Sequence, residues 1–261
     1  MPRSARDAAA HVDDVFRSVS GTLDVWRPPV EEVLGAEHVA GRGTGSRVAR
    51  LDACVAALVL PELARADPLL VGAGVIADSP STRDADVHFA WWLGPLEGNP
   101  VLGATTEPTR LDLSTRGYTE YLRDFRALEW YRVPATTHRA HVTGPYVDHL
   151  CTCDYIVTVT MPLSPAPSSA GHERPVAGVV GADIAVRRLE QELLPAFLDV
   201  PEPLALVGPQ GRVVISTSPS LPTGSLAASA RSIACTAAPF AVLVDPRPAP
   251  PATEDEDDPP D

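Results

Sequence analysis

Aromatic and acidic side chains gather in one stretch of this chain. Trp130 and Tyr131 are adjacent, Tyr146 and Asp148 follow in a Tyr-x-Asp pattern, and Asp183 lies in a Gly-Val-Val-Gly-Ala-Asp run. Aromatic faces attract a cation through their quadrupole, and carboxylates supply charge and hydrogen-bond acceptors. At the strand and loop positions expected for them, these residues could enclose one small cationic ligand. This is chemistry of recognition more than of reaction, although a single Trp such as Trp130 is more often a core residue.

Asp183 is the sharpest indication of a site because it interrupts an apolar run. A buried carboxylate is costly unless something positive or hydrogen-bonding meets it. The residues alone leave three partners open: a ligand ammonium group, Arg139, or backbone N–H groups. Asp78, Asp86 and Trp92 could complete the cavity from the preceding strands, but they fit turn and core positions better.

The same residues resemble a known family. The stretch is similar to the double Cache ligand-sensing domains of bacterial receptors, whose first PAS-like module carries a Trp-Tyr pair, a Tyr-x-Asp and a later Asp in a Gly-Val-Val-Gly-x-Asp strand. The resemblance covers residues 66–246 and is strongest over 118–190. In the amino-acid-binding branch the Tyr-x-Asp and the later Asp hold the ligand's ammonium group, so the resemblance implies that role for Tyr146, Asp148 and Asp183.

One position departs from that branch. An Arg two residues before the Trp holds the ligand's carboxylate there, whereas this chain has Leu128. The resemblance therefore implies an amine or a related cation at least as much as an amino acid. Arg126 and Arg132 lie close enough in the sequence to offer a substitute guanidinium group, and the sequence does not tell whether either turns inward.

Composition bounds the fold and the partners. At 261 residues and 44% hydrophobic, the chain can bury a core in one large domain or two small modules. A net charge of −13 argues against nucleic acid, whose binding needs a basic surface. The Pro-, Asp- and Glu-rich segment 247–261 is predicted to be a disordered acidic tail. No Gly-rich phosphate or dinucleotide motif is present, so no cofactor is expected.

The location is predicted from two further features. The N-terminus leads into an amphipathic pattern without the apolar core of a secretory signal. The longest apolar run, Ala53–Leu60, is far shorter than the roughly 20 residues of a spanning helix. We therefore expect no membrane span and a cytoplasmic protein that passes its signal to a separate, unidentified output protein. This differs from the resembling receptors, which usually sense outside the membrane.

The N-terminal 66 residues are predicted to be helical. Apolar residues recur at three- and four-residue spacing from Ala8 to Trp26, and Pro28 and Pro29 should end this helix. A second helix is expected over 30–39, and a third from near Ser46, kinked or split at Pro61. In the resembling family a long N-terminal helix often dimerises, so the resemblance implies a possible homodimer; ordinary cover for a sheet is an equally good interpretation.

After residue 66 the apolar period changes to that of strands. The fold class is predicted to be α+β, with PAS-like antiparallel sheets in two modules: a ligand-binding module over 67–200 and a smaller one over 201–246. A helix is expected over 118–128 and another over 184–198, which Pro195 could shorten. The expected strands cover 70–77, 87–92, 141–143, 155–161, 177–184, 204–207, 212–217, 232–236 and 240–244.

Two other functions stay open from the sequence. Asp148 and Asp183 could act as acid and base in an enzyme, with His141 or His149 abstracting a proton, but no nucleophile elbow or phosphate loop accompanies them. We therefore expect no enzyme. Alternatively, the chain could be a structural partner protein with a vestigial pocket. A zinc site is not predicted, because the spacing of its conceivable ligands matches no common signature: His141, His149, Cys151 and Cys153.

Overall fold

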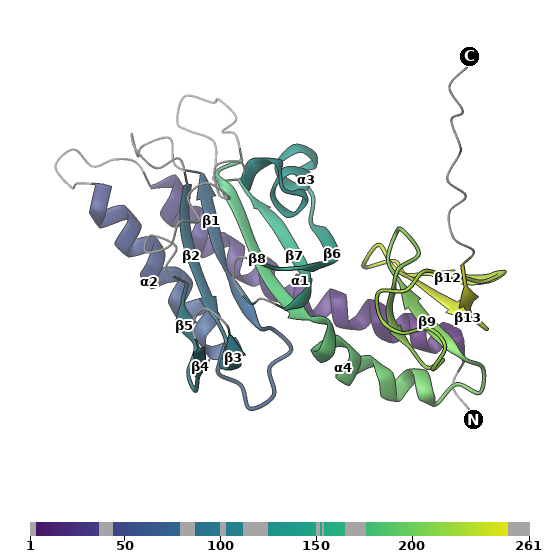
Figure 1. Cartoon of the computed structure of the whole chain (residues 1–261). Coiled ribbons are helices and arrows are strands. Elements are labelled where there is room, and N and C mark those ends of the chain that lie inside the picture. Colours follow the sequence, from purple (N-terminus) through teal and green to yellow (C-terminus); the bar gives the residue numbers. More distant parts are fainter. Residues whose placement is uncertain are drawn as a thin grey trace, which may run out of the picture. The chain divides into compact units, whose positions relative to one another are not determined.

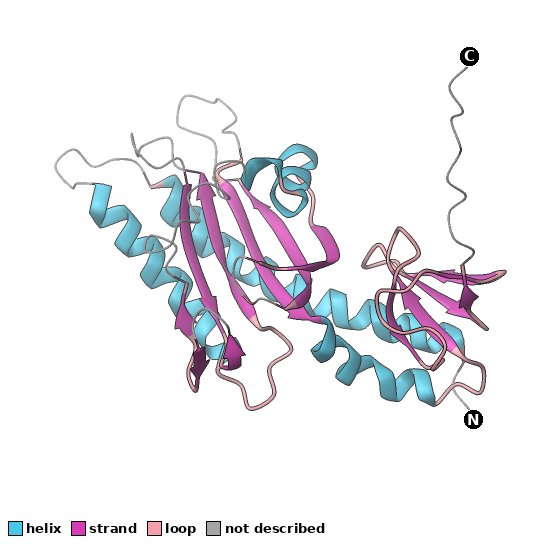
Figure 2. Ribbon diagram, in the orientation of Figure 1, coloured by secondary structure: helices cyan, strands magenta, loops and turns pink. Residues whose placement is uncertain are grey.

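Helices and antiparallel sheets build the chain, as the computed structural model in Figure 1 and Figure 2 shows. The structure describes residues 4–36, 44–78, 87–99, 103–111, 125–149, 152, 154–164 and 176–249. Its internal contacts divide it into a larger unit, Val12–Glu192, and a smaller unit formed by Met1–His11 and Leu193–Asp261. The mixed α+β class expected from the sequence is confirmed, and the predicted boundaries of the four segments stay a prediction.

A six-stranded antiparallel sheet forms the centre of the larger unit, in the order β5-β2-β1-β8-β7-β6 (Figure 1). The predicted neighbours β1 and β2 do pair antiparallel. β-Branched and aromatic residues favour these strands because their side chains pack well on a pleated surface. The strands are β1 (Gly72–Asp78), β2 (Val87–Leu93), β5 (Thr109–Arg110), β6 (His141–Val147), β7 (Tyr155–Leu163) and β8 (Gly178–Ala185), and β3 (Leu96–Asn99) pairs separately with β4 (Gly103–Thr105).

The register of the strands assigns each residue to one of two faces, since successive side chains alternate. Directly opposed residues on one face form a row across the sheet: Leu93, Gly72, Asp183, Thr158 and Thr143. We call this surface the Asp183 face. The opposite face presents buried apolar side chains, among them Val75, Val159 and Ile184. Both faces therefore bury apolar residues, because Ile76, Trp91 and Leu93 form a core cluster on the Asp183 face.

Helix α2 (Thr44–Leu63) covers the face opposite Asp183, where it contacts β1 and β2 (Figure 1). Asp52 on this helix binds His88 Nε2 at 2.8 Å and Arg110 Nη2 at 2.7 Å. Pro61 lies in the last turn of the helix, which ends at Leu63. Because both partners of Asp52 come from this side of the sheet, the ion pairs fix the helix there.

Helix α1 runs from Ala5 to Gly35 without a break, so the predicted end at Pro28 and Pro29 is wrong. A proline inside a helix removes one backbone hydrogen bond and crowds the preceding turn. Here the apolar spacing continues in phase through Trp26 and Val30, both buried, so packing of this stripe offsets the loss. The helix predicted over 30–39 is thus the last part of α1 within the described residues.

Helix α3 (Glu129–Thr137) lies beside β6, β7 and β8 (Figure 1). Thr160 Oγ1 donates a 2.8 Å hydrogen bond to the Trp130 carbonyl, which places the start of α3 over the Asp183 face. Trp130 and Tyr131 therefore belong to a helix, and the strand and loop positions expected for these aromatic residues are wrong. The helix predicted over 118–128 lies outside the described residues up to 124, and 125–127 form a short 3₁₀ turn.

The smaller unit contains a four-stranded antiparallel sheet in the order β10-β9-β13-β12. Its predicted hairpin is confirmed: β9 pairs with β10 across a turn where Gly211 has φ +72°, a conformation that favours glycine. Helix α4 (Val186–Leu198) continues through Pro195. The remaining bounds are β9 (Leu204–Val207), β10 (Val213–Ser216), β11 (Ala227–Ala228), β12 (Arg231–Ala234), β13 (Ala241–Val244) and β14 (Arg247–Pro248).

Candidate ligand-binding site

Asp183 stands in the middle of its face, buried between β1 and β7. Its side chain is only 4% exposed. Thr158, directly opposite on β7, donates its hydroxyl proton to Asp183 Oδ1 at 2.7 Å. Among the described residues no Arg or His forms an ion pair with this carboxylate, and the chain contains no lysine. Arg139, a partner considered from the sequence, is exposed.

The surroundings of Asp183 disfavour its negative charge. Burial raises the pKa of Asp183 well above its usual range, and the nearby Asp148 carboxylate raises it further. The hydrogen bond from Thr158 acts in the opposite direction. The site therefore favours either a proton on Asp183 or a cation beside it.

Tyr146 reaches the site through Thr158. Its hydroxyl lies 2.7 Å from Thr158 Oγ1. Since the single hydroxyl proton of Thr158 goes to Asp183, Tyr146 is the donor in this bond. The sheet register shifts between Thr143 and Tyr146, and Gly144 there has φ +110°, with a Cβ at that position falling 2.9 Å from the Ile156 carbonyl oxygen. Glycine is required at this bulge, which aims Tyr146 at Thr158.

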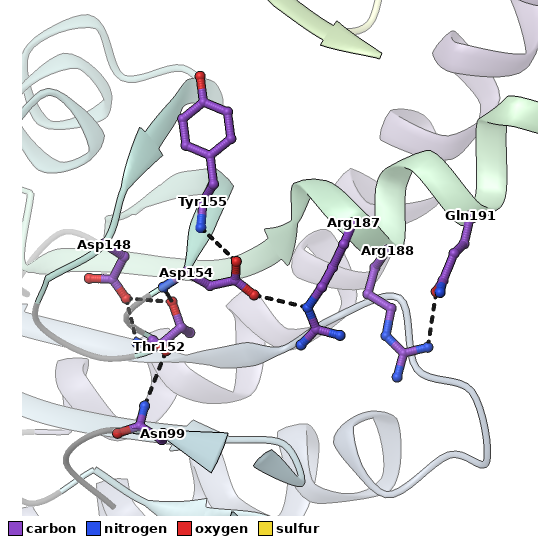
Figure 3. Close-up of polar contacts among 8 residues, drawn as sticks. All are labelled: Asn99, Asp148, Thr152, Asp154, Tyr155, Arg187, Arg188 and Gln191. Atoms are coloured by element: carbon purple, nitrogen blue, oxygen red, sulfur yellow. Dashed lines mark hydrogen bonds and ion pairs between the residues drawn. The ribbon is translucent and has the colours of Figure 1, made fainter. Parts of the chain in front are cut away.

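Asp148 closes the turn between β6 and β7 (Figure 3). Its Oδ2 accepts hydrogen bonds from the Thr152 backbone N–H at 2.7 Å and from the Thr152 hydroxyl at 2.9 Å. Asn99 Nδ2 donates to the Thr152 carbonyl at 3.1 Å, and Arg187 Nε binds Asp154 Oδ2 at 3.0 Å. Asp148 thus has a structural role of its own, while its charge also acts on Asp183.

Tyr131 and Trp130 pack on the apolar part of the Asp183 face. Tyr131 is buried, and its ring meets Phe125 edge to face with centroids 4.8 Å apart. Trp130 is half-buried against the same cluster. Burial and the Asp78 carboxylate raise the pKa of Tyr131 to about 12. Both rings contribute apolar surface near the site, and the described contacts do not bring them to Asp183 itself.

Neither arginine considered as a substitute for the missing one turns toward Asp183. Arg126 binds Asp78 through two nitrogens, at 2.5 and 3.1 Å, and stacks on Phe125. Arg132 is exposed on α3. Leu128, at the position of the carboxylate-binding Arg, precedes the first residue of α3 and is 36% exposed. The Asp78 carboxylate is therefore paired with Arg126. Asp86, the other acid considered for the cavity, lies outside the described residues.

Trp92 is a buried core residue, the assignment that the sequence favours for it, and the neighbouring Trp91 is the one on the Asp183 face. Trp92 pairs with Arg110 in the register and lies on the face away from Asp183, with the Arg110 guanidinium 5.8 Å from its ring. Trp91 lies on the Asp183 face and is 4% exposed. Trp91 and Thr158 were both missed. Side chains alternate along a strand, so the strand pairing identifies Trp91 and Thr158 as residues of the Asp183 face. The sequence alone does not give this pairing.

The two alternative chemistries receive no support from the described geometry. His141 Nε2 binds Glu129 Oε1 at 2.9 Å, and His149 is exposed. No group of three His, Cys, Asp or Glu side chains in the described ranges could hold a metal ion. Cys151 and Cys153 lie outside those ranges.

Comparison with known proteins locates the fold. No protein-family model and no curated protein sequence matches the chain. Structural similarity extends over 94% of this chain and 90% of the extracellular domain of histidine kinase soHK1S-Z6, with a TM-score of 0.57 and 13% identity. The ligand-binding domain of Campylobacter jejuni chemoreceptor Tlp3 in complex with L-valine gives a TM-score of 0.55 at 12% identity over the same shares. Methyl-accepting chemotaxis protein X gives 0.53 at 17% identity, over 93% of this chain and 96% of that one.

The chain thus has the fold of bacterial sensory domains. This confirms the double Cache, PAS-like fold expected from the residues of the site. The comparisons do not support the expected cytoplasmic location, because the kinase domain is named as extracellular, and that expectation is withdrawn. No helix in the described part of the chain has the length and apolarity needed to cross a membrane.

Proposed function

We propose that this chain is a sensory domain whose larger unit binds a small cationic amine at Asp183. One observation carries the proposal: a carboxylate that is 4% exposed accepts a hydrogen bond from Thr158 and has no cationic partner among the described residues. A buried charge without a partner is costly, and an ammonium group supplies both charge and N–H donors. The likeness to sensory domains, one of them named in complex with an amino acid, supports the same reading.

The ligand class is an amine in preference to an α-amino acid. Recognition of a carboxylate calls for a guanidinium group or a comparable donor. Arg126 is already engaged with Asp78, Arg132 is exposed, and Leu128 replaces the expected Arg. A ligand carboxylate would also meet the charges of Asp148 and Asp183. We therefore expect amino acids to bind no more tightly than their decarboxylated amines.

The five residues predicted from the sequence divide into four roles in this proposal. Asp183 meets the ligand, and Tyr146 orients Asp183 through Thr158. Asp148 holds the turn and adds negative potential. Trp130 and Tyr131 supply an apolar wall from α3. Catalysis by Asp148 and Asp183 is the weaker alternative, because Asp148 Oδ2 already accepts two hydrogen bonds.

A thermal-shift screen followed by calorimetry tests the proposal. A ligand that binds only the folded state raises the melting temperature by mass action. The panel contains primary amines, quaternary ammonium compounds, amino acids and purines. Asp183→Asn should strongly reduce each amine response, whereas Asp14→Asn, which removes a charge from an exposed site on α1, should keep it. An amine that binds Asp183→Asn as tightly as the wild type would refute the site.

A separate output protein would receive the signal, and a homodimer through the N-terminal helices stays a prediction. The apolar stripe of α1, including Phe16 and Leu23, is buried within the chain itself. A dimer would therefore need another surface of these helices. Sedimentation of the chain with and without the bound amine measures the oligomeric state directly.

A further inference from the structure

Two buried polar atoms on the Asp183 face make no hydrogen bond. In the described part of the chain three buried side-chain polar atoms lack a hydrogen-bond partner: Trp91 Nε1, Thr143 Oγ1 and Arg188 Nε. The guanidinium group of Arg188 is bound through Nη1 to Asp67 and Gln191. Buried polar groups are rarely left without a partner, so the two on the Asp183 face require an explanation.

The indole ring of Trp91 packs against three glycines of the sheet. A Cβ added to Gly72 would fall 3.0 Å from Trp91 Nε1, one added to Gly74 would fall 3.0 Å from Cε3, and one added to Gly181 would fall 3.4 Å from Cη2. These glycines sit side by side on β1 and β8. The absence of their side chains lets the ring lie close to the sheet, with Nε1 on the side of Gly72.

Nε1 and the carboxylate of Asp183 converge over Gly72. The same added Cβ would fall 3.2 Å from Asp183 Oδ2. An indole N–H can only donate a hydrogen bond, and an ionised carboxylate can only accept one. A ligand that satisfies both must therefore carry a donor and an acceptor close together. An ammonium group and an oxygen on the neighbouring carbon have this arrangement.

We propose that Trp91 Nε1 is a specificity-determining group that binds a neutral oxygen acceptor next to the ammonium group, so that the preferred ligands are 2-amino alcohols. This inference rests on the proposed function, since Asp183 must hold the ammonium group. The acceptor is neutral because Asp148 and Asp183 place negative charge at the site, which repels a carboxylate. Thr143 is on the same face but two strands from Asp183, in the direction away from Gly72 and Trp91. It is therefore not part of the pair formed by Trp91 Nε1 and Asp183.

One rival explanation has a different signature. A small shift of the ring would let Trp91 Nε1 donate to Asp183 Oδ2 itself. Removal of the indole N–H would then weaken the binding of every amine by the same factor, because the ligand oxygen would not contact Trp91. Amines that differ only in that oxygen separate the two cases.

The test uses two matched pairs in which a hydroxyl replaces a methyl group: ethanolamine with n-propylamine, and 2-amino-1-phenylethanol with 2-phenylpropylamine. Calorimetry gives the affinity ratio within each pair for the wild-type chain, Trp91→Phe and Trp92→Phe. Trp92 receives the same substitution on the opposite face and is the control. We expect the wild type and Trp92→Phe to prefer the alcohol by about two- to tenfold, and Trp91→Phe to lose this preference.

Each other outcome overturns the inference. A preference that persists in Trp91→Phe places the oxygen elsewhere, and an equal loss for both members of a pair assigns Trp91 to Asp183. If the wild-type chain binds the methyl analogues as tightly as the amino alcohols, the role of Trp91 is refuted, but the proposed function is not. If no amine of either pair or of the screening panel binds, the proposed function fails too. Should Trp91→Phe not fold, 3-benzothienylalanine at position 91 removes the N–H with little change in ring shape.

Discussion

Replacing Asp183 with asparagine separates a binding carboxylate from a structural one, because the two roles predict opposite effects on stability. Asn keeps the size of the side chain and an oxygen that accepts the Thr158 hydrogen bond. It removes a charge that is buried and close to Asp148. The chain without ligand should therefore be no less stable after the substitution, whereas loss of a structural carboxylate lowers the free energy of unfolding.

The effect depends on pH in a defined direction. In the unfolded chain an Asp titrates near pH 4, and in the folded chain the pKa of Asp183 lies well above that value. Between these two pKa values the folded state holds the proton that the unfolded state has released. The contribution of Asp183 to stability therefore falls as pH rises through this window. Relative to the wild type, Asp183→Asn should gain stability as the pH rises above the unfolded pKa, through this window.

Binding should change in the opposite sense. A hydrogen bond to a charged group contributes about 1.5 to 3 kcal/mol, which corresponds to roughly a 10- to 100-fold change in Kd. Calorimetry with the tightest amine of the screen measures this loss, and urea unfolding at pH 5, 7 and 9 measures stability. A variant that is markedly destabilised at every pH, or that binds the amine normally, would show that Asp183 is a structural residue.

Three further predictions test the surroundings of Asp183. Amine binding to the wild type should tighten as pH rises from 5 toward the raised pKa of Asp183, because the ammonium group replaces the proton, and calorimetry in buffers of different ionisation enthalpy should detect the released proton. Gly72→Ala should push Trp91 Nε1 and Asp183 apart and weaken amine binding several-fold, at a stability cost of about 1 kcal/mol; unchanged binding would contradict the convergence over Gly72. Asp148→Ala should lower the free energy of unfolding by about 2 to 3 kcal/mol in urea titrations, because the Thr152 N–H and hydroxyl lose their acceptor, and an unchanged stability would show that the turn does not depend on it.

The strands were predictable because their residues carry a local signal. Runs such as Tyr155–Leu163 and Gly178–Ala185 combine β-branched residues with buried neighbours on both faces, and the structure forms strands there. The hairpin around Gly211 was predictable for the same reason, since turn and strand signals follow one another. Local chemistry thus sufficed for the elements that form the sheets.

The errors arose where distant packing overrides a local rule. Pro28 and Pro29 disfavour a helix locally, yet α1 continues because Trp26 and Val30 are buried in phase. Trp130 was placed on a strand or in a loop, although the Trp130 carbonyl accepts a hydrogen bond from Thr160 at the start of α3. Neither contact can be seen in a window of neighbouring residues.

The candidate site was predictable in its acids but not in its hydrogen bonds. The cost of Asp183 in an apolar run follows from its sequence alone, and the structure places it in the centre of a sheet. That Asp148 serves the turn, and that Thr158 and Trp91 stand beside Asp183, follows only from the register of four strands. A shift of one residue would have exchanged Trp91 for Trp92.

A carboxylate that lowers the stability of the ligand-free chain is suited to a sensor. Ligand binding then also raises the stability of the folded state around the site. In the proposed function an ammonium group at Asp183 would relieve the cost of the buried charge. Thr158 already binds this carboxylate, and Tyr146 binds Thr158. Binding to the folded state alone stabilises it by about 2.7 kcal/mol at a ligand concentration of 100 times Kd. Thr158 lies on β7, the strand that follows the turn held by Asp148, so we expect the gain in stability to reach this strand. Hydrogen exchange of β7 with and without an amine should therefore show greater protection in the bound state, and equal protection would mean that the ligand acts on some other element.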